Sequence, residues 1–339
     1  MHGGALSTSG TPIPGGPFPG TSVPGTSVSG ASVSGTTASG SFPRQPAAFS
    51  DRITRDGSSG YTAQPGRYQL YVSLADPWSH RALIVRRLLG LERVIGVTVT
   101  DPIPGERGWR FPDHAGDPVT GAQWLAELYL ATDPGYAGRC TVPLLWDTYR
   151  HRIVTNDFPQ ITIMLETEFS EFHRPGAPDL YPPALRREID ATGALIHHAV
   201  SSGVYRAGMA TTQAAYEEAF DAVFTTLDAL EERLGRRRFL LGRQLCEADV
   251  RLWVTLARFD AVYYSHFKCN LRRISDYPSL WAYARDLYAL PAFRDTTRFD
   301  QIKRHYYTTH PHLNPSRIVP DGPVLDWNAP AGREHLTRR

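Results

Sequence analysis

Asp76 begins the stretch of this sequence that has the clearest potential for chemistry. An alternating apolar run precedes it, and a run with helical spacing follows, starting with Pro77-Trp78-Ser79-His80. Proline is favoured at the first helical position, which has no use for the missing N–H. Asp76 is therefore expected at a helix N-cap, where backbone N–H groups converge and the helix dipole favours negative charge. Its carboxylate is either a plain cap or a general acid or base facing a substrate.

The cysteines and the residues that follow Asp76 give weaker signals. Cys140, Cys246 and Cys269 are far apart and form no CxxC pair, so they predict neither a disulfide framework nor a metal site. Cys140 stays a candidate for a catalytic thiol outside the Asp76 turn, because it lies just before Val142-Pro143. Ser79 either donates to a ligand or belongs to the capping pattern of Asp76, and His80 is expected as a surface or packing residue.

Hydrophobic periodicity predicts an α/β first half with the order β-α-β-(α)-β-β-α. The expected strands cover 68–74, 94–100, 142–147 and 153–154, and the expected helices cover 77–89, 124–131 and 156 to about 169. Gly90 is the expected stop of the first helix. Residues 101–121, rich in proline and glycine, predict a long loop, and loops of this length are often functional.

The second half has a different character, with amphipathic segments at 182–202, 211–235, 247–265 and 277–290 and no convincing strand. Asp249 is expected to cap the third of these segments. The division predicts two domains, 49–175 and 176–325, joined near the proline-rich residues 172–182. Residues 1–48, mostly Gly, Ser, Thr and Pro, are expected to be a disordered tail, and 326–339 a C-terminal tail.

Composition excludes several function classes for this chain of 339 residues. A formal net charge of +2 gives no field that favours nucleic acid or an acidic membrane surface. No run approaches the ~18 apolar residues of a membrane span, and the N-terminal residues lack the pattern of a secretion signal. With only three separated cysteines, a reducing cytoplasmic location is the expectation.

Several strings in the chain are too long and specific for a chance match. They are residues 204–213, 247–249, 258–263, 266–270 and 302–315 in the second half, with 108–111 and 141–143 in the first. The strings resemble the glutathione transferase fold and, more narrowly, the glutathionyl-hydroquinone reductases of the Xi class. This resemblance covers residues 50 to about 325. It implies an α/β thioredoxin-like N-terminal domain plus an all-α C-terminal domain, a homodimer, and a cis Pro143 that places the Val142 backbone at a thiol site.

The resemblance also shows where this chain departs from the family. A Cys-Pro-Trp-Ala motif there supplies the thiolate that attacks a glutathionyl-hydroquinone, and Asp76-Pro77-Trp78-Ser79 stands in its place. A carboxylate has no such reactivity, so the reductase reaction is expected to be absent or vestigial. The family's Glu-Ser pair, which grips glutathione, aligns with Asp157-Phe158. Losing that polar contact costs ~1–3 kcal/mol, roughly tenfold to a hundredfold in affinity.

Four aromatic residues, Trp109, Tyr205, Tyr263 and Tyr306, keep the pocket that the resemblance assigns to a small aromatic substrate. The leading hypothesis is an enzyme that acts on a quinone or phenol, in which Asp76 transfers a proton and the three tyrosines orient substrate oxygens. The substrate- or thiol-binding residues are then expected to be Trp78, Ser79, Trp109, Val142, Pro143 and Asp157. No metal is expected.

A carboxylate near a bound thiol would raise the pKa of that thiol by like-charge repulsion, which favours proton transfer over conjugation. Two alternatives stay open. One is a non-catalytic binding protein with the same fold. The other is a thiol-dependent transferase or reductase that uses Cys140, glutathione or another low-molecular-weight thiol.

Overall fold

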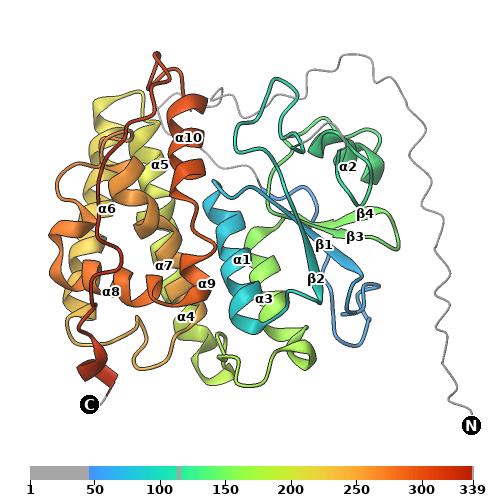
Figure 1. Ribbon diagram of the computed structural model, residues 1–339, viewed down its shortest axis with the longest axis horizontal. Coiled ribbons are helices and arrows are strands. Elements are labelled where there is room, and N and C mark those ends of the chain that lie inside the picture. Colours follow the sequence, from blue (N-terminus) through green and yellow to red (C-terminus); the bar gives the residue numbers. More distant parts are fainter. Residues whose placement is uncertain (1–45, 113–115, 338–339) are drawn as a thin grey trace, which may run out of the picture.

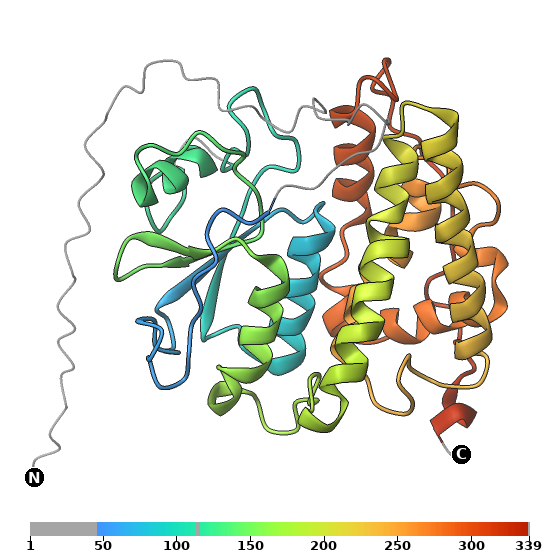
Figure 2. The ribbon, with the colours of Figure 1, turned by 180° about the vertical axis from the view of Figure 1, so that it is seen from behind.

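The computed structural model describes residues 46–112 and 116–337, and it divides into an α/β half and an all-helical half that lie side by side (Figure 1). The view from behind shows the same division (Figure 2). The predicted fold class, a thioredoxin-like domain followed by a helical domain, is confirmed. The predicted disordered tail over 1–48 lies outside the described residues, apart from 46–48.

The α/β half is built on one mixed sheet with the strand order β2-β1-β3-β4. Strand β1 (Tyr68–Val72) pairs in parallel with β2 (Ile95–Val99) and antiparallel with β3 (Leu144–Asp147). Strand β4 (Arg152–Thr155) completes the sheet antiparallel to β3. Helices α1 (Pro77–Leu89) and α3 (Phe158–Thr167) lie between the sheet and the helical half, whereas α2 (Leu125–Thr132) lies on the other side (Figure 1).

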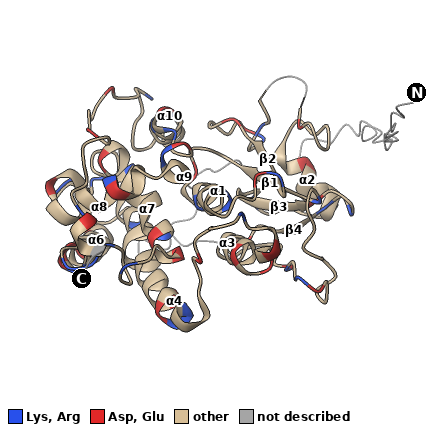
Figure 3. Ribbon diagram, turned by 60° about the horizontal axis from the view of Figure 1, so that its bottom comes forward, with Lys and Arg blue, Asp and Glu red and all other residues tan. Residues whose placement is uncertain are grey.

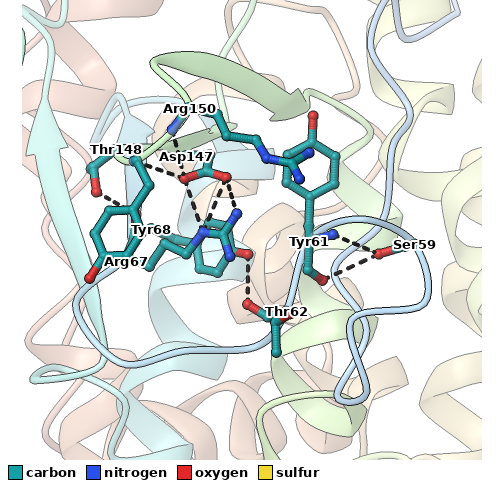
Figure 4. Close-up of polar contacts among 9 residues, drawn as sticks. Ser59, Tyr61, Thr62, Arg67, Tyr68, Asp147, Thr148 and Arg150 are labelled. Carbon is teal, nitrogen blue, oxygen red and sulfur yellow. Dashed lines mark hydrogen bonds and ion pairs between the residues drawn. The ribbon is translucent and has the colours of Figure 1, made fainter.

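A buried ion pair joins the residue before β1 to the last residue of β3. Arg67 Nε lies 3.1 Å from both carboxylate oxygens of Asp147, which faces Tyr68 across the two strands. The same carboxylate accepts the backbone N–H of Tyr149. The Tyr68 hydroxyl donates to the carbonyl of Thr62 (Figure 4). These contacts fix β1, the strand that leads into residue 76.

Helix α1 has the bounds that the sequence predicts. Asp76 is its N-cap, and Pro77 occupies the first helical position. Gly90 ends it with φ 74°, a left-handed conformation that glycine adopts without a Cβ clash. Most of α1 is buried, because the sheet packs on one side of it and the helical half on the other.

The helical half contains α4 (Arg186–Leu195), α5 (Gly203–Gly208), α6 (Gln213–Leu234), α7 (Glu247–Arg258) and α8 (Pro278–Tyr288). Two π-helical segments, Ile196–Ser201 and Phe259–Tyr263, continue α4 and α7. The predicted cap of α7 is present, since Asp249 accepts the backbone N–H of Cys246 at 2.9 Å.

Two further helices, α9 (Pro291–Arg294) and α10 (Phe299–Thr309), were not predicted. Helix α10 buries only Ile302, Tyr306 and Tyr307, so its apolar stripe is too narrow to stand out in the sequence. Within the predicted C-terminal tail, Trp327 packs on the rings of Trp253 and Trp281.

A buried ion pair joins the two halves. Arg81 of α1, 2% exposed, donates to the Glu247 carboxylate of α7 at 2.7 Å. The Thr162 hydroxyl of α3 donates to the same oxygen at 3.1 Å, and Arg251 also pairs with Glu247. Outside this region, charges of both signs are spread over the two halves (Figure 3). Within the described residues, no helix combines the length and apolar character needed to cross a bilayer.

Candidate active site

A cavity of about 460 Å³ lies between the two halves, at the N-terminus of α1. The α/β half supplies one wall from α1, α3 and the loops before β3, and the helical half supplies the other from α5, α10 and the π-helical segment after α4. Seven of the sequence-predicted site residues line it: Asp76, Trp78, Trp109, Val142, Asp157, Tyr205 and Tyr306.

Asp76 serves as the N-cap of α1 and also lines the cavity. Its backbone is extended, and its Oδ2 accepts the backbone N–H of Ser79 at 2.6 Å. The side chain is half-buried, so it faces the cavity while one oxygen holds the helix. This geometry is compatible with a plain cap and with a proton-transferring group.

Ser79 and His80 are both buried away from the cavity. Ser79 is 0% exposed, and its hydroxyl accepts the Ser73 N–H at 3.3 Å, which corrects the prediction that it contacts a ligand. The Nδ1 of His80 lies 3.2 Å from a nitrogen of Arg258, and burial together with that charge holds the pKa of His80 well below its usual value. His80 is therefore a neutral packing residue.

The three predicted tyrosines form a hydrogen-bonded chain. The hydroxyls of Tyr205 and Tyr306 are joined by a short hydrogen bond, and the Tyr306 hydroxyl lies 3.0 Å from that of Tyr263. Tyr205 and Tyr306 line the cavity, whereas Tyr263 is buried behind them, which corrects its predicted contact with substrate. Burial raises the pKa of all three hydroxyls, so they stay protonated at neutral pH and act as donors.

Trp109, in the long loop before α2, stacks on His305 of α10 with ring centroids 5.7 Å apart and an interplanar angle of 11°. The Nδ1 of His305 donates to the carbonyl of Pro102 at 2.5 Å, so α10 holds this loop over the cavity. Burial lowers the pKa of His305 to about 4, and the imidazole is therefore neutral at pH 7.

The end of the cavity expected to hold a thiol has an aromatic wall. Trp78 packs on Phe158 with ring centroids 4.5 Å apart, and His197 lies 5.3 Å from Trp78. Val142 lines the cavity and precedes a cis peptide bond, as the resemblance implies, while Pro143 itself is buried and does not line it. Phe158 therefore places an aromatic ring at the position where the family's Glu-Ser pair has a serine that binds glutathione.

Cys140 lines the cavity but is a poor nucleophile in this environment. Burial raises the pKa of its thiol to about 12, so almost no thiolate is present at neutral pH. The described residues contain no group of three or more His, Cys, Asp or Glu side chains that could hold a metal ion.

Sequence reasoning missed several charged or titratable side chains of the cavity, among them Arg139, His197, His198, Arg206, His305 and His310. The sequence indicates only some of these residues. Arg206, His305 and His310 stand in the family-like strings, but nothing in the residue spacing shows which side of a helix faces the cavity.

Models of two families match the chain. The one described as glutathione S-transferase, N-terminal domain, matches residues 77–168, and the one described as glutathione S-transferase, C-terminal domain, matches 213–286. The glutathionyl-hydroquinone reductase YqjG of Escherichia coli is 46% identical over 303 residues, or 86% of this chain and 92% of the relative. The glutathionyl-hydroquinone reductase PcpF of Sphingobium chlorophenolicum is 47% identical over 270 residues, or 78% and 86%.

Solved structures give the same result. A glutathione transferase from Gordonia bronchialis superposes with a TM-score of 0.83 at 50% identity, covering 85% of this chain and 91% of that chain. The glutathione-bound structure of YqjG from Escherichia coli superposes with a TM-score of 0.82 at 46% identity, covering 85% and 96%.

Proposed function

This chain belongs to the glutathione S-transferase family, alongside the glutathionyl-hydroquinone reductases, and from that premise we propose that it converts a quinone- or phenol-type aromatic metabolite by acid–base chemistry. The observation that carries the proposal is one cavity lined by a carboxylate, Asp76, and by two neutral hydroxyls, those of Tyr205 and Tyr306. Aromatic side chains complete the wall, as a flat substrate requires.

The proposed step moves one proton. The Asp76 carboxylate accepts a proton from a ring hydroxyl or an adjacent carbon, and the electron pair stays on the substrate as a phenolate or enolate. Tyr205 and Tyr306 donate hydrogen bonds to the developing oxyanion, which they can do because burial keeps them protonated. The carboxylic acid of Asp76 then returns the proton elsewhere on the substrate. Isomerisation, elimination and ring closure all follow this pattern.

Glutathione would lack in this cavity one polar contact that the resemblance implies for the family. The aligned Phe158 offers a ring that packs on Trp78 and no hydrogen-bonding group. Asp76 cannot form a mixed disulfide, and the Cys140 thiol is protonated. The proposal therefore routes no step through a thiol.

Asp76→Asn tests the proposal, because it removes the proton acceptor and keeps the side-chain size. We expect turnover to fall by about 10²- to 10⁴-fold on whichever member of a panel of hydroquinones, phenols and quinones the parent converts, followed by absorbance. The parent should also be slow with a glutathionyl-hydroquinone. If the parent reduced that substrate at a rate that Asp76→Asn left unchanged, both parts of the proposal would be wrong.

One observation favours a second candidate, a non-catalytic binding protein. The Asp76 carboxylate already accepts the Ser79 N–H at 2.6 Å, a complete structural role. Asp76→Ser keeps a capping oxygen but removes the base. A binding protein would bind aromatic ligands equally well after this change, by calorimetry, and would show no turnover before it.

Family membership also supports a homodimer. Light scattering behind a sizing column would measure about twice the 37.7 kDa chain mass, and a monomer at micromolar concentration would contradict this.

A further inference from the structure

Arg258, the last residue of α7, lies against the turn that carries residue 76. Its side chain is fully buried. Nε and Nη2 both donate to the carbonyl oxygen of Ala75, at 3.2 and 3.0 Å. Nη1 donates to the Val254 carbonyl at 2.8 Å and to Nδ1 of His80 at 3.2 Å. Ala75 directly precedes Asp76, so the guanidinium of the helical half fixes the peptide that leads into α1.

The charge of Arg258 has no carboxylate partner in the part of the chain that the structure describes. It contacts two backbone carbonyls and one neutral imidazole. Arg81, also buried between the halves, is instead neutralised by Glu247. Burying an unpaired guanidinium is costly. A cost of this kind is characteristic of sites where a charge acts on a neighbouring functional group.

We propose that Arg258 is a positioning residue that favours a negative charge at residue 76. It does so in two ways: it holds the Ala75–Asp76 peptide in place and it supplies an uncompensated positive charge beside the N-terminus of α1, which itself favours an anion. This inference rests on the proposed function only in one respect, namely that the negative charge at residue 76 serves to accept a proton from the substrate. The field reaches further into the cavity, because Arg258 also lowers the pKa of Tyr205 and Tyr306, against the larger effect of burial, which raises both.

The other groups along the cavity wall do not replace this charge. Asp157 adds a second carboxylate, and Arg139 and Arg206 contribute guanidiniums that are only half-buried and so partly screened by water. Burial lowers the pKa of His305 to about 4 and that of His310 to about 3, so both are neutral at pH 7.

A thiol placed at residue 76 would report the field there without any substrate. In the Asp76→Cys protein, the rate of alkylation by iodoacetamide against pH gives the pKa of the new thiol, since only the thiolate reacts. The native thiols contribute little, because burial raises the pKa of Cys140 and Cys269 to about 12 and also raises that of Cys246. We expect a pKa below the value of about 8.5 for a free cysteine.

Adding Arg258→Gln removes the charge and keeps one donor for Ala75. We expect alkylation at pH 6 to slow by about tenfold. Arg258→Lys keeps the charge and should stay within about threefold of the Arg258 protein. The matched control is Arg87→Gln, which removes an exposed charge of α1 paired with Asp295 and should change nothing.

An unchanged pH profile after Arg258→Gln would overturn the proposal, and so would equal slowing by Arg258→Lys. Circular dichroism checks folding. If the glutamine variant does not fold, Arg258→Met, which fills the same buried space without charge, takes its place under the same criteria. The result is independent of turnover. Asp76→Asn without effect on activity would remove the proposed function and leave this measurement standing.

Discussion

On the α/β wall of the cavity the Asp76 carboxylate accepts the Ser79 N–H within the turn that starts α1, whereas on the helical wall the hydroxyls of Tyr205 and Tyr306 bond to each other. A carboxylate bound to its own helix has little freedom to move toward a ligand. Linked hydroxyls can instead turn a donor toward a ligand while staying joined. The α/β wall therefore fixes one group in place, and the helical wall offers adaptable donors.

Tyr306→Phe should give the largest effect on the helical wall. Its hydroxyl bonds to the hydroxyls of both other tyrosines, so its loss removes two hydrogen bonds of the chain. We expect kcat/KM to fall by about a hundredfold, the scale of a lost hydrogen bond to a charged oxygen. The matched change Tyr263→Phe, behind the cavity wall, should cost only about threefold. Equal losses for the two variants would contradict the assignment of Tyr263 to a supporting position.

Acid should destabilise the helical wall through two histidines, His305 and His310. Burial lowers the pKa of His305 to about 4 and that of His310 to about 3, against about 6.5 in the unfolded chain. Between these values the unfolded state binds more protons, so stability falls as pH falls below about 6.5. At pH 5 each histidine should cost about 2 kcal/mol, measured by urea unfolding at pH 7 and pH 5.

His305→Gln is the control for that measurement, since glutamine still donates to the Pro102 carbonyl but does not titrate. This variant should lose less stability between pH 7 and pH 5, because only the contribution of His310 remains. A variant as acid-sensitive as the parent would show that His305 does not contribute.

A smaller effect, on glutathione affinity, is expected when the family's Glu-Ser pair is introduced at residues 157 and 158 of the α/β wall. Asp157→Glu with Phe158→Ser replaces the ring that packs on Trp78 by a hydroxyl and lengthens the carboxylate. Glutathione should bind about tenfold tighter by calorimetry. Phe158→Leu, which removes the ring without adding a polar group, is the control, and equal gains in both proteins would point to space rather than hydrogen bonding.

The smallest effect concerns the cap itself. Asp76→Ala removes the acceptor for the Ser79 N–H and should lower the free energy of unfolding by about 1 kcal/mol, whereas Asp76→Ser should cost only a few tenths. Thermal unfolding of the two variants measures this. A large loss for both would mean that the carboxylate stabilises the fold by more than capping.

Sequence reasoning located elements better than it oriented side chains. The bounds of α1 followed from Pro77 and Gly90, whose chemistry is local. The inward position of Ser79 could not be predicted, because nearly all of α1 is buried and no polar face marks one side. The family resemblance assigns Tyr263 to the substrate pocket, whereas the structure places it behind the cavity wall. Its placement depends on the rotation of a π-helical segment against α10, and residue spacing does not encode that contact.

The Arg81–Glu247 pair has a consequence for protein engineering. Each half contributes one buried charge. If the halves are expressed as separate polypeptides, Glu247 keeps its pair with Arg251 of the same helix, whereas Arg81 loses the carboxylate that it donates to. A hybrid that grafts this α/β half onto the helical half of a relative therefore needs an acidic side chain at the position of Glu247. Without one, we expect the hybrid to accumulate as insoluble material, however well its backbones superpose.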